Sequence, residues 1–122
     1  MLHTGYVLIT GASHGIGRAA AHVFASHGYP LLLNGFHSPK ALKTLGETLQ
    51  SQYHITCETS VGDVGDAAYV QKLFRECTAR DISLEILINN AGISHIGLFQ
   101  DMSIESWQRI VNTNLTSCFL FC

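Results

Sequence analysis

Residues 10–17 read Thr-Gly-Ala-Ser-His-Gly-Ile-Gly and directly follow an apolar run, Tyr-Val-Leu-Ile, at residues 6–9. An apolar strand that turns through glycines into a helix is an arrangement with which α/β proteins bind phosphate groups. Gly11 permits a tight turn, Gly15 lets the backbone approach a pyrophosphate, and Gly17 lets the helix pack against the strand. The helix N-terminus adds free N–H groups and the positive end of its dipole. The segment therefore predicts an anion-binding turn, although a glycine cluster alone also fits a plain structural turn.

Outward from this turn, the chain alternates apolar runs with segments of helical periodicity. The apolar runs predict strands at Tyr6–Thr10, Leu31–Asn34, His54–Thr59 and Leu84–Ile88. The periodic segments predict helices at Gly15–His27, at Pro39–Gln52, from a cap at Asp66 to Ala79, and from Ser103 onward. The residues expected on the buried face of the first helix are Ile16, Ala20, Val23 and Phe24. Such an alternation predicts an α/β fold with a doubly wound parallel sheet.

A second motif, Asn-Asn-Ala-Gly at residues 89–92, follows the apolar run Ile-Leu-Ile at residues 86–88, and Thr10 is expected to hydrogen-bond to it. It lies about 75 residues after the glycine-rich segment, with Asp63-Val64 between the two and Asn-Thr-Asn-Leu at residues 112–115 beyond them. In this order the motifs resemble the classical short-chain dehydrogenase/reductase family, with an overall likeness to its 3-oxoacyl-[acyl-carrier-protein] reductases. The resemblance extends over essentially the whole chain. It implies a Rossmann-type sheet in which residues 1–122, as a single NAD(P)-binding domain incomplete at its C-terminus, supply the strand order 3-2-1-4.

The resemblance implies a nicotinamide dinucleotide at the carboxyl edge of this sheet. Asp63 and Val64 would contact the adenine, although Asp63 also fits a plain turn or cap, and residues 90–92 would lie at the nicotinamide ribose. The cofactor-binding residues expected on this basis are Gly11, Ser13, His14, Gly15, Ile16, Gly17, Phe36, Asp63, Val64, Asn90, Ala91 and Gly92. Asn114 aligns with the family's catalytic asparagine, which holds a water in a proton relay, whereas a helical asparagine alone is commonly a solvated or capping residue.

The choice between NAD and NADP depends on the end of the second strand. An acidic residue there would bond the ribose hydroxyls of NAD, whereas a nearby arginine would suit the phosphate of NADP. Residues 34–37 read Asn-Gly-Phe-His and contain neither, and His14 occupies a glycine-loop position that often holds arginine in NADP-dependent relatives. The missing acid favours NADP, but Asn-Gly-Phe resembles the same stretch in NAD-dependent bacterial 3-hydroxybutyrate dehydrogenases. NAD(P) is therefore expected, with a slight lean to NADP.

The family's catalytic serine and Tyr-x-x-x-Lys pair are expected downstream of Asn114, and none of the 4 tyrosines here has a lysine four residues later. We therefore expect the chain to be the N-terminal half of a reductase, interrupted inside a helix and inactive alone. The implied reaction of the parent protein is hydride transfer between nicotinamide and a ketone or secondary alcohol, with a 3-oxoacyl thioester as one candidate substrate. Two alternatives are a non-catalytic dinucleotide-binding module and an unstable truncated gene product.

Composition limits the remaining classes of protein. Apolar residues make up 47% of the chain and charged residues 13%, with a formal net charge of −2. Because there is no basic stripe, nucleic acid and membranes are not expected as partners. The partner that the family resemblance implies is a small carbonyl compound. The cysteines form no Cys-x-x-Cys and no signal peptide is recognisable, which indicates a cytoplasmic protein without a metal site. The apolar stripe from Trp107 to Phe119 either covers the sheet or, as the resemblance implies for the full-length protein, forms a homo-oligomer interface.

Overall fold

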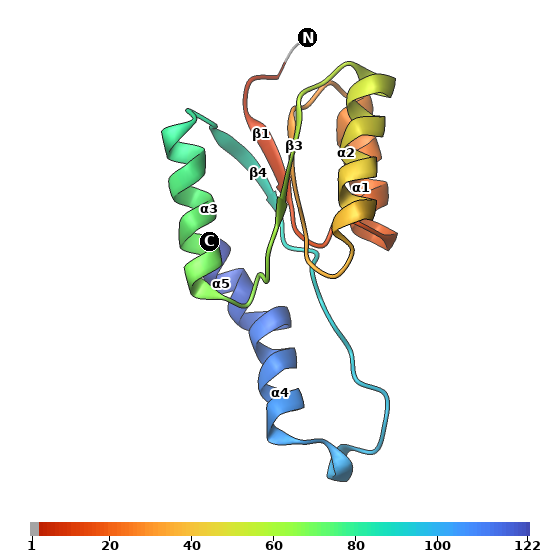
Figure 1. Ribbon diagram of the computed structural model, residues 1–122, viewed down its shortest axis with the longest axis vertical. Coiled ribbons are helices and arrows are strands. Elements are labelled where there is room, and N and C mark those ends of the chain that lie inside the picture. The colour runs from red at the N-terminus through yellow and green to blue at the C-terminus, as the bar shows by residue number, and fades with distance from the viewer. Residues whose placement is uncertain (1–2) are drawn as a thin grey trace.

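The computed structural model describes residues 3–122, which form a single parallel sheet flanked by helices (Figure 1). The sheet has the order β3-β2-β1-β4, and every neighbouring pair of strands is parallel. Its strands are β1 (Tyr6–Ile9), β2 (Leu31–Gly35), β3 (Cys57–Val61) and β4 (Leu84–Ile88). The predicted doubly wound, Rossmann-type sheet and its strand order are therefore confirmed.

Helices cover both faces of the sheet. In Figure 1, α1 (Gly15–Ser26) and α2 (Pro39–Tyr53) lie on one face, and α3 (Ala67–Ala79) and α5 (Ser117–Phe121) lie on the other. Each face has its own hydrophobic core, and the strand side chains point alternately into the two cores. Val7, Leu31 and Leu33 face α1 and α2, whereas Leu8 and Leu32 face the side of α3 and Phe121. This two-sided burial explains why β1 and β2 read as continuous apolar runs.

The predicted third strand was placed too early. It was expected to begin at His54, but β3 begins at Cys57. His54 instead ends α2, with a left-handed φ of 56° and its N–H bonded to Gln50 O at 3.0 Å. A residue in this conformation turns the chain out of the helix, so the strand starts only after the turn is complete. The strand also ends two residues later than predicted, at Val61, and the ends of the other elements differ by at most one residue.

The predicted buried face of α1 is wrong at two positions. Ile16 is 81% exposed and Val23 is 57% exposed, whereas the buried residues of α1 are Gly17, Ala21 and Ala25. These small residues recur every four positions and let the helix approach the sheet closely. Hydrophobicity alone favours the large side chains, but the short distance between α1 and the sheet leaves no room for them.

The C-terminal helical region contains a segment of π-helix. It consists of α4 (Ile104–Val111), the π segment η2 (Asn112–Thr116) and α5, and a short 3-10 helix η1 (Phe99–Asp101) precedes it. The predicted cap at Ser103 is confirmed, because its hydroxyl accepts the N–H of Ser106 at 3.1 Å. Figure 1 shows α4 extending beyond the strand ends. Leu115 and Phe119 are 69% and 80% exposed, so at these positions the apolar stripe does not cover the sheet.

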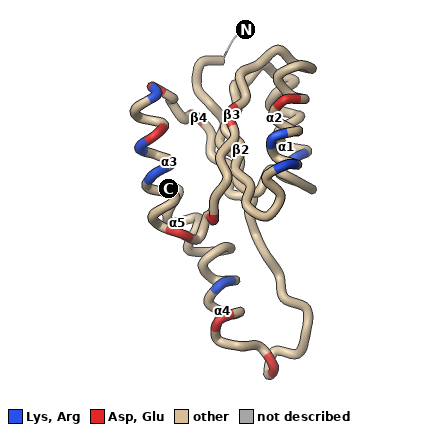
Figure 2. The backbone as a smooth tube through the Cα atoms, in the orientation of Figure 1, with Lys and Arg blue, Asp and Glu red and all other residues tan. Residues whose placement is uncertain are grey.

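Charged residues lie mainly on the helices and at the ends of the strands (Figure 2). None of the helices within residues 3–122 combines the length and the apolar character that a membrane crossing requires.

Candidate functional site

Side-chain hydrogen bonds join the ends of β1 and β4. Thr10 Oγ1 accepts the N–H groups of Asn90 at 3.0 Å and Ala91 at 2.9 Å. In return, Asn90 Nδ2 donates to Thr10 O at 3.1 Å and to Gly11 O at 3.0 Å. The predicted bond from Thr10 to the second motif is therefore confirmed. These contacts lie where the strand order reverses, which is the position at which open α/β sheets bind ligands.

The turn after β1 uses two glycines in the left-handed region. Gly11 has a φ of +62° and Gly15 a φ of +57°. A side chain at Gly11 would place its Cβ 2.8 Å from Ala91 Cα, whereas a Cβ at Gly15 would have nothing within 4 Å. The N-cap of α1, His14, makes no side-chain cap hydrogen bond. The first turn of α1 therefore presents N–H groups and its positive dipole end to the open space beside Gly15.

A cavity of about 360 Å³ lies at this edge of the sheet. The predicted cofactor-binding residues that line it are Gly11, Ser13, His14, Gly15, Phe36, Asp63, Val64, Asn90, Ala91 and Gly92. Two other predicted residues do not line it, because Ile16 points outward and Gly17 is buried against Asn90. A Cβ at Gly17 would come within 2.5 Å of both Asn90 Nδ2 and Gly11 O. Gly17 thus acts beneath the cavity, by holding α1 close to the strand ends.

Other residues that line the same cavity are not among the predicted cofactor-binding residues. They are Asn34, Gly35, His37, Ser38, Gly62, Ile93, Arg109 and Thr113. Asn34 had a recognisable signal, since it is a polar residue that closes an apolar strand at the carboxyl edge. Arg109 and Thr113 are one helical turn apart on the final helix, but the path of residues 93–103 decides which face of that helix meets the cavity.

Ser13 carries an unsatisfied hydroxyl. The residue is only 8% exposed, and its Oγ has no hydrogen-bond partner within residues 3–122. A buried hydroxyl without a partner costs about 1–3 kcal/mol. Because Ser13 lines the cavity, a ligand with a phosphate or hydroxyl oxygen there would remove this cost. The residues present therefore fit a dinucleotide.

The loop after β3 forms another wall of the cavity. Asp63 Oδ1 accepts the N–H of Gly65 at 2.9 Å, so the turn role considered for this aspartate is present. This bond engages one of the two carboxylate oxygens, and Asp63 and the buried Val64 both line the cavity. A Cβ at Gly65 would lie 3.1 Å from the backbone of Asn112. The loop is thus packed directly against the π segment of the final helix.

Asn114 lies in this π segment and bonds to the backbone after the second motif. Its Oδ1 accepts the N–H of Ile93 at 2.8 Å and its Nδ2 donates to Ile93 O at 2.9 Å. In this arrangement the amide holds the segment that follows Gly92 against the final helix. Its catalytic role stays a prediction.

A second cavity, of about 600 Å³, lies between α1 and α2 and shares Ser13, His14, His37 and Ser38 with the first. Its lining includes Arg18 and Lys40, together with hydroxyl groups, and contains no acidic residue. Figure 2 shows basic segments on both helices. Neither residues 34–37 nor the glycine loop contains an arginine or lysine, and these cations come instead from the neighbouring helices.

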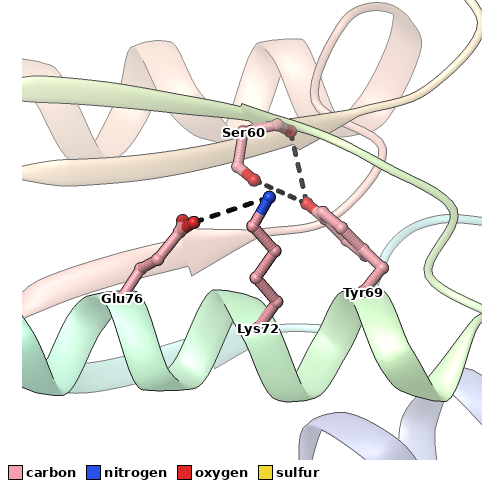
Figure 3. Close-up of polar contacts among 4 residues, drawn as sticks. All are labelled: Ser60, Tyr69, Lys72 and Glu76. Atoms are coloured by element: carbon pink, nitrogen blue, oxygen red, sulfur yellow. Dashed lines mark hydrogen bonds and ion pairs between the residues drawn. The ribbon is translucent and has the colours of Figure 1, made fainter.

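One constellation has the residue types of a Ser-Tyr-Lys catalytic group but not its geometry. Tyr69 Oη lies 2.7 Å from Ser60 Oγ, while the exposed Lys72 Nζ pairs with Glu76 at 3.9 Å and not with Tyr69 (Figure 3). Burial raises the pKa of Tyr69, and its hydrogen bonds with Ser60 and Asn34 offset part of that rise. Tyr69 therefore keeps its proton, and we assign this group a structural role.

In the part of the chain that the structure describes, no three His, Cys, Asp or Glu residues converge as metal ligands. Burial, with a smaller effect of Glu58, raises the pKa of Cys57 to about 12, so this thiol stays protonated.

A parallel sheet in the order 3-2-1-4, with a glycine-rich turn after its first strand, defines the Rossmann class of α/β folds. A model of the short chain dehydrogenase family matches residues 5–122, and the chain belongs to this family. The resemblance inferred from the motifs is thereby confirmed.

Curated relatives include two bacterial enzymes. The D-beta-hydroxybutyrate dehydrogenase of Cupriavidus necator is 34% identical over 119 residues, covering 98% of this chain and 45% of the relative. The 3-oxoacyl-[acyl-carrier-protein] reductase FabG of Aquifex aeolicus is 33% identical over 113 residues, which cover 93% of this chain and 45% of the relative. The chain therefore spans slightly less than half the length of these relatives.

Solved structures have the same fold over nearly the whole chain. The short-chain dehydrogenase from Sphingobium yanoikuyae in complex with NADPH has a TM-score of 0.86 and 31% identity, covering 96% of this chain and 45% of that one. An alcohol dehydrogenase from the archaeon Thermococcus sibiricus, complexed with 5-hydroxy-NADP, has a TM-score of 0.89 and 25% identity. The match covers 98% of this chain and 50% of that one.

Proposed function

We propose that this chain is the dinucleotide-binding part of an NAD(P)-dependent oxidoreductase. The observation that carries the proposal is the cavity at the strand ends, where the open backbone of Gly15 and the unsatisfied hydroxyl of Ser13 face a common space. Residues 11–15 and the N-terminus of α1 would hold the pyrophosphate. Asp63 and Val64 would hold the adenine, and residues 90–92 the nicotinamide ribose. When bound, the nicotinamide supplies the hydride acceptor or donor.

For the parent protein, the proposed reaction is hydride transfer between the nicotinamide and a ketone or secondary alcohol. The family relationship and the two named relatives support this class, and a 3-oxoacyl thioester is one candidate substrate. Asn114 is the one proposed catalytic residue among these 122 residues, since the family's serine and Tyr-x-x-x-Lys pair are not among them. We expect the 122-residue chain to bind the cofactor without turning over substrate. Steady oxidation of NADPH by this chain with a ketone would contradict that expectation.

We further propose that the parent protein is cytoplasmic and homo-oligomeric. The exposed apolar side chains of the final helical region, among them Trp107, Leu115 and Phe119, support a subunit interface there.

The direct test of the function is dinucleotide binding. Because a ligand that binds only the folded state stabilises it, NADP⁺ is expected to raise the melting temperature in a concentration-dependent way. Isothermal titration calorimetry would give the dissociation constants of NADP⁺ and NAD⁺. If neither dinucleotide shifts the transition nor gives heat at millimolar concentration, the proposed function is wrong.

NADP is proposed as the preferred cofactor because of the second cavity. Arg18 and Lys40 provide positive charge there, while the residue at the end of β2 that lines the first cavity, Asn34, carries no negative charge to favour ribose hydroxyls. The solved relative that binds NADPH supports the same choice.

We expect the double variant Arg18→Gln, Lys40→Gln to bind NADP⁺ at least about tenfold more weakly, because two charge-assisted contacts to the extra phosphate are lost. The dissociation constant of NAD⁺, which lacks that phosphate, should change by less than about twofold. Lys43→Gln is the matched control, since Lys43 is on α2 but does not line either cavity. An equal loss of affinity for both dinucleotides, or no loss of affinity for NADP⁺, would refute the assignment of Arg18 and Lys40 to the extra phosphate.

A further inference from the structure

A buried side chain connects two walls of the first cavity. Asn34, at the end of β2, is 1% exposed and uses both ends of its amide. Its Oδ1 accepts the N–H of Gly11 at 3.2 Å, and its Nδ2 donates to Gly62 O at 3.1 Å and to Tyr69 Oη at 3.0 Å. Only this orientation of the amide satisfies both the N–H donor and the carbonyl acceptor. Asn34 thus joins the glycine-rich turn after β1 to the loop after β3.

Tyr69 fixes the second end of this connection. Its hydroxyl accepts from Asn34 and therefore directs its own proton toward Ser60, at the end of β3 (Figure 3). Its ring lies over Gly62, where an added Cβ would come within 2.0 Å of ring atoms. Because burial raises the pKa of Tyr69, the hydroxyl stays protonated and keeps this bonding pattern. The position of Gly62 is therefore determined by the ring packed on it and by the amide bonded to it.

Gly11 and Gly62 both line the cavity, whereas Tyr69 does not. We infer that Asn34 and Tyr69 are positioning residues for the dinucleotide, which set the separation between the pyrophosphate turn and the adenine loop. This inference rests on the proposed function, because the ligand that spans the two walls is the dinucleotide.

If Asn34 and Tyr69 set this separation, a change in either residue should weaken a ligand that spans both walls more than a ligand that contacts one wall. A dinucleotide contacts both walls, so it gains affinity when their separation is held at the right value in the free protein. Adenosine is expected to contact only the loop after β3. A change in the separation should therefore weaken binding of the dinucleotide more than binding of adenosine. A general loss of folded protein would instead weaken the apparent binding of both ligands equally.

The test is Tyr69→Phe, which keeps the ring over Gly62 and removes only the hydroxyl. We expect the dissociation constant of NADP⁺, measured by calorimetry, to rise about three- to tenfold, the effect of one buried hydrogen bond. That of adenosine, measured by ligand-observed NMR, should change by less than about twofold. Tyr53→Phe is the matched control, because Tyr53 is also half-buried but its hydroxyl bonds to Gln52 and His22 away from the cavity. This control should leave both constants unchanged.

Ser60→Ala is the second variant, to be used if Tyr69→Phe shows no cooperative melting transition. It removes the neighbour of the Tyr69 hydroxyl without touching the cavity lining, and it should weaken NADP⁺ selectively by a smaller factor. Unchanged NADP⁺ affinity in the folded variant, or equal weakening of adenosine, overturns the inference while the proposed function stands. Absence of NADP⁺ binding to the unaltered protein is a different result, because it removes the proposed function itself.

Discussion

Gly17→Ala is expected to weaken dinucleotide binding about 100-fold, because the α1 N-terminus must move away from the strand ends. The added Cβ would lie 2.5 Å from Gly11 O and from Asn90 Nδ2, and neither the backbone oxygen nor the bonded amide can yield without disturbing the turn. Alanine is a better helix former than glycine, by about 1 kcal/mol, so helix propensity does not account for a loss. The measurement is the dissociation constant of NADP⁺ by calorimetry.

The control for this variant is Gly46→Ala, at another buried helical glycine. Its Cβ would meet Thr59 Cγ2 at 3.0 Å and Cys57 Sγ at 3.8 Å, and both belong to side chains far from the cavity lining. Gly46→Ala should bind NADP⁺ as the unaltered protein does. If Gly17→Ala also binds normally, the close approach of α1 is not what forms the site.

Thr10→Val is expected to lower the free energy of unfolding by about 2–4 kcal/mol, because it leaves two N–H groups without their acceptor. Valine has nearly the shape of threonine, and Thr10 is only 2% exposed, so packing changes little. The hydroxyl that is lost accepts from Asn90 and Ala91. Chemical denaturation gives the change in free energy.

Thr10→Ser should recover most of this stability, since it keeps the oxygen and removes only a methyl group. A Thr10→Val protein as stable as the unaltered chain would show that the β1–β4 contact does not depend on this hydroxyl.

Much of the fold could be predicted from local patterns. The leucine run of β2 and the alternation of strands with helices were sufficient for the parallel sheet, because strands buried on both faces leave a continuous apolar signature. The errors arose where a tertiary constraint overrides local hydrophobicity. His54 adopts a left-handed turn that delays β3, and the close approach of α1 buries Gly17 where Ile16 was expected.

The candidate site likewise contains residues that local patterns could predict and residues that they could not. Residues within the motifs, such as Gly15 and Asn90, could be placed at the cavity because their position depends on neighbours in sequence. Arg18, Lys40 and Arg109 were missed because they reach the cavities from helices whose orientation depends on the whole chain. Which of these residues contact a ligand stays a prediction until binding is measured.

The hydrogen bonds between Thr10 and the second motif also bear on how the protein is made. They join residues 80 and 81 positions apart, so the glycine-rich turn after β1 leaves the ribosome long before its partner does. Such distant pairing is slow, because a long loop must close before the contact forms. The nascent chain can therefore build β1, α1 and β2 while the ligand site is still incomplete. Cofactor in the cell would stabilise only the molecule in which β4 has already joined the sheet, and so would act as a late check on assembly.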